Sequence, residues 1–149
     1  MLILNAGRIG LLRAATTVTA VVLMAGCAEE PIEPDDTPPD LSGSYSLVSF
    51  YVPAAGDTLR PPAVSGTFRL EQTSVMGQEA LGTMDTLSIT FPGGSQNAKG
   101  TYTNRFDGSW EQEFLTGFQA LGTYSVQGNT LTVVVTQPAL AVSTTVWRK

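Results

Sequence analysis

The chain of 149 residues contains no histidine and only one cysteine, Cys27. Histidine is the commonest general base and metal ligand, so its absence excludes a Ser-His-Asp triad and disfavours a metal centre. A single cysteine cannot form an intramolecular disulfide or a thiolate cluster. Walker A, dinucleotide-binding, EF-hand and Gly-x-Ser-x-Gly patterns are also missing. We therefore expect a protein that is not an enzyme and uses no metal or cofactor.

Charge is also scarce, at 14% of residues, and it is unevenly distributed along the chain. The net charge of -5 comes mainly from residues 28–40, which hold six acidic residues and no basic residue. Residues 41–149 hold six basic against seven acidic residues and are almost neutral. This balance gives no electrostatic case for nucleic-acid binding.

An apolar run of limited length begins the chain. Arg8 and Arg13 precede the uncharged segment 14–26, which ends in the small residues Ala25 and Gly26. As a helix this segment spans roughly 20 Å, short of the ~30 Å hydrocarbon core of a bilayer. A longer span would bury Arg13. A signal peptide is therefore favoured over a permanent transmembrane anchor.

The sequence "LMAGC" at residues 23–27 resembles the lipobox of bacterial lipoproteins, with Met24 where leucine is usual. The resemblance implies a lipoprotein signal peptide over 1–26 and lipidation of Cys27. Diacylglyceryl would join the thiol, and an acyl group such as palmitate would join the new amine after cleavage. Multiple chains give stable membrane anchoring. Ala28 after the cysteine resembles the outer-membrane sorting pattern, so we expect a lipid-anchored protein of the bacterial cell envelope, in the outer membrane, with its domain on either the periplasmic or the outer face. The alternative for Cys27 is a buried, inert thiol.

Residues 27–40 are predicted to form the lipidated cysteine and a disordered linker. The stretch "AEEPIEPDDTPPD" contains four prolines and six acidic residues. It lacks the apolar side chains for a core, and its like charges repel. Proline stiffens it toward polyproline II, so it is suited to hold a domain away from a membrane.

Residues 41–149 are predicted to form a single all-β domain. Turn signals recur every eight to twelve residues, with β-rich runs between them. Residues 76–82 and 91–97 are taken as connections. We expect an antiparallel up-and-down meander of eight strands that closes into a small barrel, since closure removes the two free edges. The expected strands are 43–52, 64–73, 84–91, 99–106, 110–115, 118–126, 130–137 and 141–148.

Period-two alternation fixes the loop lengths that keep one apolar face inward. A loop over 107–109, with Gly108 in the left-handed conformation, would pair Phe106 with Trp110. A loop over 115–117 would pair Phe114 with Phe118, and a loop over 128–129 would pair Val126 with Leu131. The first strand stays ambiguous, since Tyr45, Leu47 and Tyr51 occupy one face and Val48, Phe50 and Val52 the other. The inward face of the last strand is equally undecided, because the apolar residues Val146 and Trp147 are adjacent.

Three segments resemble lipocalin-like bacterial domains: "LSGSYSLVSF" at 41–50, "GTYSVQGNTLTVVV" at 122–135 and "TTVWRK" at 144–149. Tyr45 stands where the family has tryptophan near the first strand. Arg148 corresponds, by approximate position, to the basic residue that packs over that aromatic side chain. The resemblance implies a lipocalin-like barrel.

The predicted interior is a candidate ligand cavity. Aromatic side chains would line it, and two amides would orient a small hydrophobic ligand. The alternative is a packed core with satisfied amides, in a protein-binding or structural envelope module such as an inhibitor-like barrel. An outward stripe of Val48, Phe50 and Val52 would then meet the partner. We expect a monomer and identify no protein partner. The candidate cavity residues are Tyr102, Asn104, Phe106, Trp110, Gln112, Phe114, Phe118 and Tyr124.

Overall fold

The computed structural model describes residues 36–149. The expected signal peptide, Cys27 and most of the acidic linker lie outside the described residues. Among the residues described, no helix has the length and hydropathy needed to cross a bilayer.

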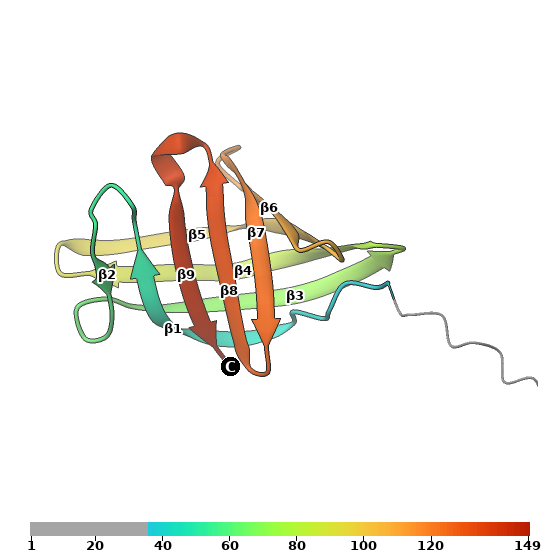
Figure 1. Ribbon diagram of the computed structural model, residues 1–149, viewed down its shortest axis with the longest axis horizontal. Coiled ribbons are helices and arrows are strands. Elements are labelled where there is room, and N and C mark those ends of the chain that lie inside the picture. The colour runs from blue at the N-terminus through green and yellow to red at the C-terminus, as the bar shows by residue number, and fades with distance from the viewer. Residues whose placement is uncertain (1–35) are drawn as a thin grey trace, which may run out of the picture. The chain divides into compact units, whose positions relative to one another are not determined.

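The described chain folds into an antiparallel β-meander that closes into a barrel (Figure 1). Each long strand pairs with its neighbour in sequence, and β1 pairs with β9 to close the sheet. This confirms the predicted all-β barrel of eight antiparallel strands. A two-residue strand, β2, adds to the end of β1. The elements are β1 Gly43–Tyr51, β2 Thr58–Leu59, β3 Ser65–Met76, β4 Glu79–Phe91, β5 Gly94–Arg105, β6 Ser109–Phe114, β7 Gln119–Gln127, β8 Thr130–Gln137, the 3-10 turn η1 Ala139–Ala141 and β9 Ser143–Arg148.

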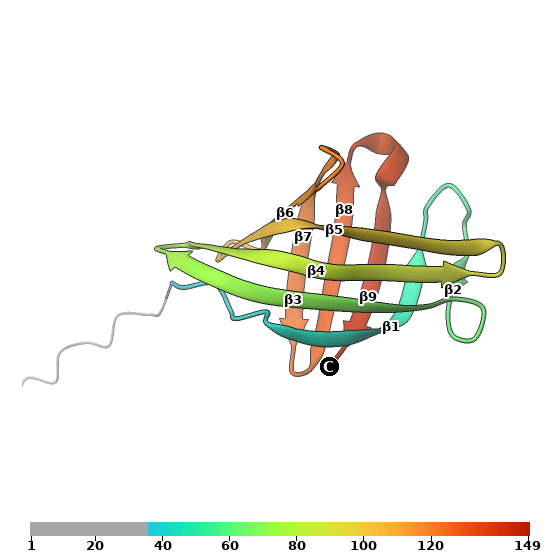
Figure 2. The ribbon, with the colours of Figure 1, turned by 180° about the vertical axis from the view of Figure 1, so that it is seen from behind.

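Long and short strands occupy opposite walls of the barrel. Strands β7, β8 and β9 cross the long strands β3, β4 and β5 at a steep angle in Figure 1, and Figure 2 shows the long strands from the other side. The register of β4 shifts between Met84 and Leu87. Such bulges bend a strand and increase its twist, which closure of a barrel requires. The bulge also changes which alternate residues of β4 point into the barrel. Ala80 and Met84 point inward before the bulge, and Ile89 points inward after it.

Strands β3, β4 and β5 are longer than predicted. The segments 76–82 and 91–97 were expected to be connections, yet most of their residues pair as strand. The turns themselves take only two residues each, 77–78 and 92–93. Polar residues at these strand ends need not be buried, so their composition resembles that of a loop.

Two of the three predicted hairpin registers are confirmed. Val126 lies opposite Leu131, and the amide of Phe114 donates to the carbonyl of Phe118 at 2.9 Å. The β5–β6 register is wrong by one loop position, because Trp110 lies opposite Asn104 and not Phe106. The loop is 106–108, and Gly108 has φ 84°. A three-residue hairpin places its left-handed residue third, after a type I turn, and Gly108 takes that third place.

A bulge resolves the ambiguity of the first strand. The β1–β9 register shifts between Leu47 and Ser49, so Tyr45 and Leu47 face inward before the shift. After it Phe50 packs against the core, with its ring 5.3 Å from that of Phe91. The proposed outward stripe of Val48, Phe50 and Val52 is therefore not formed. In β9 the inward residue is Trp147, which is 1% exposed.

The basic residue over the first-strand aromatic ring is Lys149, not Arg148. The Lys149 ammonium lies 5.3 Å from the centre of the Tyr45 ring. Arg148 is exposed and is the last residue of β9. The sequence comparison assigned this role to Arg148, one residue before Lys149. Trp147 points inward, so alternation along β9 turns Arg148 outward.

One end of the barrel is filled with side chains. We call it the packed end: it carries the turns 77–78, 106–108 and 128–129. Trp110 and Tyr102 are each 1% exposed and stack with their ring centres 5.1 Å apart. Residues 37–42 lie across this end, where Pro38 and Leu41 are buried. The last residues of the expected linker thus contact the barrel.

Candidate functional site

The opposite end of the barrel, which we call the hollow end, contains a cavity of about 400 Å³. It lies beside the β6–β7 loop, the segment 140–143 and the strand ends that lead to the β4–β5 turn. Its volume falls within the range of sites that hold small ligands. The lining residues are Phe50, Val52, Phe68, Leu87, Ile89, Gln96, Gln112, Phe114, Phe118, Ala120, Val133, Val135, Leu140, Ala141, Val142, Ser143, Thr145 and Trp147.

Buried side chains form the floor of this cavity. Phe68 and Trp147 are each 1% exposed, and their ring centres are 5.1 Å apart. The Trp147 indole N–H donates to Thr145 Oγ1 at 2.8 Å, and that hydroxyl donates weakly to the Val133 carbonyl at 3.4 Å. Their polar atoms are therefore satisfied within the protein, which leaves an apolar surface toward the cavity.

Gln112 is the polar group of the floor. It is 5% exposed, and its Nε2 donates to Met84 Sδ at 3.4 Å. A floor of aromatic side chains with one amide oxygen can hold an apolar ligand and accept a single hydrogen bond.

The rim of the cavity is less buried. Phe114 and Phe118 face each other across the β6–β7 loop with ring centres 5.7 Å apart. Phe118 is 43% exposed and Leu140 is fully exposed. Apolar side chains held at a solvent-facing rim give a ligand a continuous apolar path inward.

The structure divides the sequence-predicted cavity residues into three groups. Gln112, Phe114 and Phe118 line the cavity. The packed end contains Tyr102, Asn104, Trp110 and Tyr124, each buried below the cavity floor. Phe106 lies in the β5–β6 loop at 48% exposure, so its expected inward orientation is wrong.

Hydrogen bonds fix part of the packed end, although Tyr102 Oη, Asn104 Oδ1 and Trp110 Nε1 are buried there without a hydrogen-bond partner among the described residues. Asn104 Nδ2 donates to the Pro39 carbonyl at 3.1 Å, and Tyr124 Oη donates to the Arg105 carbonyl at 2.9 Å. Tyr45 Oη donates to the Leu41 carbonyl at 2.8 Å. Burial, assisted by the nearby Asp40 carboxylate, raises the pKa of Tyr45 to about 12. These contacts hold residues 37–42 against the strands.

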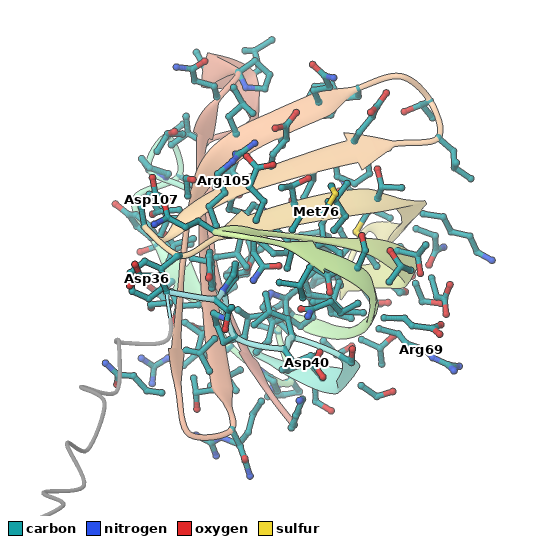
Figure 3. The ribbon with its side chains drawn as sticks, turned by 90° about the vertical axis from the view of Figure 1, so that its right-hand side faces the viewer. Asp36, Asp40, Arg69, Met76, Arg105 and Asp107 are labelled. Atoms are coloured by element: carbon teal, nitrogen blue, oxygen red, sulfur yellow. The ribbon has the colours of Figure 1, made fainter. Side chains whose placement is uncertain are left out.

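Acidic side chains surround this packed end, as Figure 3 shows for Asp36, Asp40 and Asp107. Hydrogen bonds from Ser42 lower the pKa of the Asp40 carboxyl. Hydrogen bonds from Ser109 likewise lower the pKa of the Asp107 carboxyl. Arg105 pairs with Glu79 at 2.6 Å and with Glu111 at 3.6 Å. The acidic groups are thus remote from the cavity, whose lining has no charged residue.

Sequence reasoning missed part of the cavity wall. The missed residues come from every long strand except β6 and from the segment after β8, with Phe50, Val135 and Ala141 as examples. The alternation of Leu131, Val133 and Val135 marks an inward face in β8 and could have found two of the missed positions. Phe50 required the β1 bulge, which alternation does not reveal.

Among residues 36–149, no group of three or more cysteine, aspartate or glutamate side chains is close enough to hold a metal ion. Comparisons of the chain with protein-family models, with curated proteins and with solved structures find no match.

Proposed function

We propose that this chain is a lipid-anchored lipoprotein of the bacterial envelope, non-enzymatic, whose barrel binds a small hydrophobic ligand. The observation that supports binding is the cavity of about 400 Å³, with its apolar walls and its single amide on the floor. A fully packed, partner-binding barrel has less support, because the hollow end is not filled and the stripe of Val48, Phe50 and Val52 is absent.

The place where the chain enters the barrel is compatible with an anchor. Residues 36–42 approach the packed end, on the side opposite the β4–β5 turn (Figure 1). A tether joined at the packed end leaves the hollow end unobstructed for a ligand. We propose Cys27 as the anchored residue and the outer membrane as the site of anchoring.

Binding is tested with the neutral fluorophore N-phenylnaphthylamine, whose emission rises in apolar surroundings. Every core residue lies between Leu41 and Trp147, so the chain from Ala28 onward contains the complete core. This chain should bind the fluorophore at one site. Ala120→Trp, which places a large side chain on the cavity floor, should abolish binding, while circular dichroism checks that the fold is retained. An unchanged signal in Ala120→Trp would place the fluorophore outside the cavity.

Anchoring is tested separately in a bacterium that expresses the full chain. Metabolic labelling with an alkyne analogue of palmitate should mark the protein, and mass spectrometry should find Cys27 as the modified N-terminus. Cys27→Ala should lose the label and stay unprocessed. Recovery of an unlabelled protein that begins elsewhere would reject the lipoprotein proposal and leave the cavity proposal intact.

A further inference from the structure

A second apolar hollow lies outside the barrel wall, next to the cavity. It has a volume of about 610 Å³ and lies between β5 and the β6–β7 loop. Phe114 and Phe118 line both this groove and the cavity. The two spaces are therefore separated by this pair of rings. The groove is lined by Thr86, Asn97, Ala98, Lys99, Phe114, Leu115, Thr116 and Phe118.

The groove exists because β5 and β6 separate. Strand β5 pairs with β4 over its whole length, but with β6 only from Gly100 to Asn104. The last contact is the amide of Leu115, which donates to the carbonyl of Lys99 at 2.9 Å. Beyond it, residues 94–98 of β5 have β4 on one side and the groove on the other. The barrel wall is thus open laterally at the hollow end.

Lys99 lines the groove, and it is the single charged residue among those that line the groove or the cavity. It is exposed, and the ion pairs of the described chain, which use Arg69 and Arg105, do not include it. On β4 the bulge opposite Lys99 contains Asp85, whose carboxylate pairs with Arg69 at 3.7 Å, and on β6 Glu113 lies opposite Thr101. An ammonium without a carboxylate partner, at the mouth of an apolar groove, attracts an anion whose remaining atoms are apolar.

We propose that the ligand is a single-chain amphiphile with an anionic headgroup. Its tail would enter between Phe114 and Phe118 into the cavity, and its headgroup would stay in the groove beside Lys99. This inference rests on the proposed binding function and adds the ligand class and the entry route. The anionic headgroup can be a carboxylate or a phosphate, since both satisfy an ammonium.

The experiment measures how decanoate and decanol displace N-phenylnaphthylamine from the chain that begins at Ala28. The two competitors share one tail and differ in charge. In Lys99→Met, decanoate should bind roughly threefold to fivefold more weakly, as for a partly exposed ion pair, with decanol unchanged. Glu113→Gln should strengthen decanoate binding slightly. Added salt should weaken decanoate binding in the wild type and much less in Lys99→Met.

Lys149→Met is the matched control, because it removes the same charge from the packed end. It should leave both competitors unchanged. An equal loss of decanoate affinity in Lys149→Met and Lys99→Met, or no loss in Lys99→Met, overturns the proposed headgroup site. If the fluorophore and decanol also fail to bind the wild type, the proposed function itself fails. Decyl phosphate, compared with decanoate across the same variants, distinguishes a phosphate from a carboxylate headgroup.

Discussion

The packed end and the hollow end are built from the same eight strands, yet only the packed end is filled. At the packed end Trp110 and Tyr102 stack, and Tyr102 lies directly over Gly82, where a Cβ atom would collide with its ring. At the hollow end Ala120 and Val133 occupy equivalent inward positions and leave space. A few inward side chains, opposite a glycine or an alanine, decide whether a small barrel has a core or a cavity.

The two ends also differ in how they are closed. Residues 37–42 lie across the packed end and hydrogen-bond to it through Pro39 and Leu41. At the hollow end the described chain provides the short turn η1, the connection from β1 to β3 that contains β2, and exposed rim side chains. Stability and binding are thereby separated along the barrel axis, since the packed end supplies most of the core and the hollow end supplies the site.

The largest expected contrast comes from removing one aromatic side chain at each end. Trp110→Ala should lower the free energy of unfolding by about 3–5 kcal/mol, because it leaves a void in a filled core. Phe114→Ala should cost only about 1–2 kcal/mol, since the side chain is half-buried beside an existing cavity. Urea unfolding measures both values. Equal losses would mean that the hollow end contributes to the core as much as the packed end does.

Two glycine-to-alanine substitutions, one at each end of the barrel, test the same contrast by adding a methyl group. Gly82→Ala should destabilise the protein by about 1–3 kcal/mol, since the new methyl group meets the Tyr102 ring and the Glu71 carbonyl. Gly93→Ala, in the β4–β5 turn at the hollow end, meets nothing within 4 Å and should be nearly neutral. Thermal unfolding of the two variants measures the difference. A neutral Gly82→Ala would show that the packed end can relax.

The sequence predicted the strand order and the closure because both follow from alternation and turn residues. Gly128 and Asn129 set the β7–β8 register, and Gly117 set the β6–β7 register. The position of the cavity could not be predicted in this way. It depends on the bulge in β1 that turns Phe50 inward, and such a bulge bends a strand in a way that alternation along the sequence does not reveal.

The residues named from the sequence line the cavity only where inward orientation and the hollow end coincide. Alternation identified Gln112 and Phe114 as inward, and both line the cavity. It identified Trp110 and Tyr102 equally well as inward, but these residues fill space. Alternation predicts on which face of a strand a residue lies. It does not predict how far along the barrel axis that residue lies, because this position depends on the register of the strand with all the other strands.

Alkaline pH should weaken the packed end specifically. Burial raises the pKa of Tyr45 to about 12, and burial also raises the pKa of Tyr102. An unfolded tyrosine loses its proton near pH 10, so above that value the unfolded state binds fewer protons than the folded state. The stability from these phenols is complete below pH 10 and declines as the pH rises toward 12. Urea unfolding across this range should show a smaller decline in Tyr45→Phe; an identical pH dependence would exclude Tyr45 as a source.

The smallest expected effect concerns the last two residues, which carry the same charge and differ in what they contact. Lys149 lies 5.3 Å from the centre of the Tyr45 ring, and an exposed cation–π contact is worth about 0.5–1 kcal/mol. Lys149→Met should therefore lower the free energy of unfolding by roughly 0.5 kcal/mol. Arg148→Met removes a cation that makes no such contact and should have a smaller effect. If Arg148→Met is the more destabilising of the two, the contact between Lys149 and the Tyr45 ring is not what stabilises this end of the chain. Because neither residue approaches the cavity, both variants should bind N-phenylnaphthylamine as the wild type does, which separates closure of the packed end from binding at the hollow end.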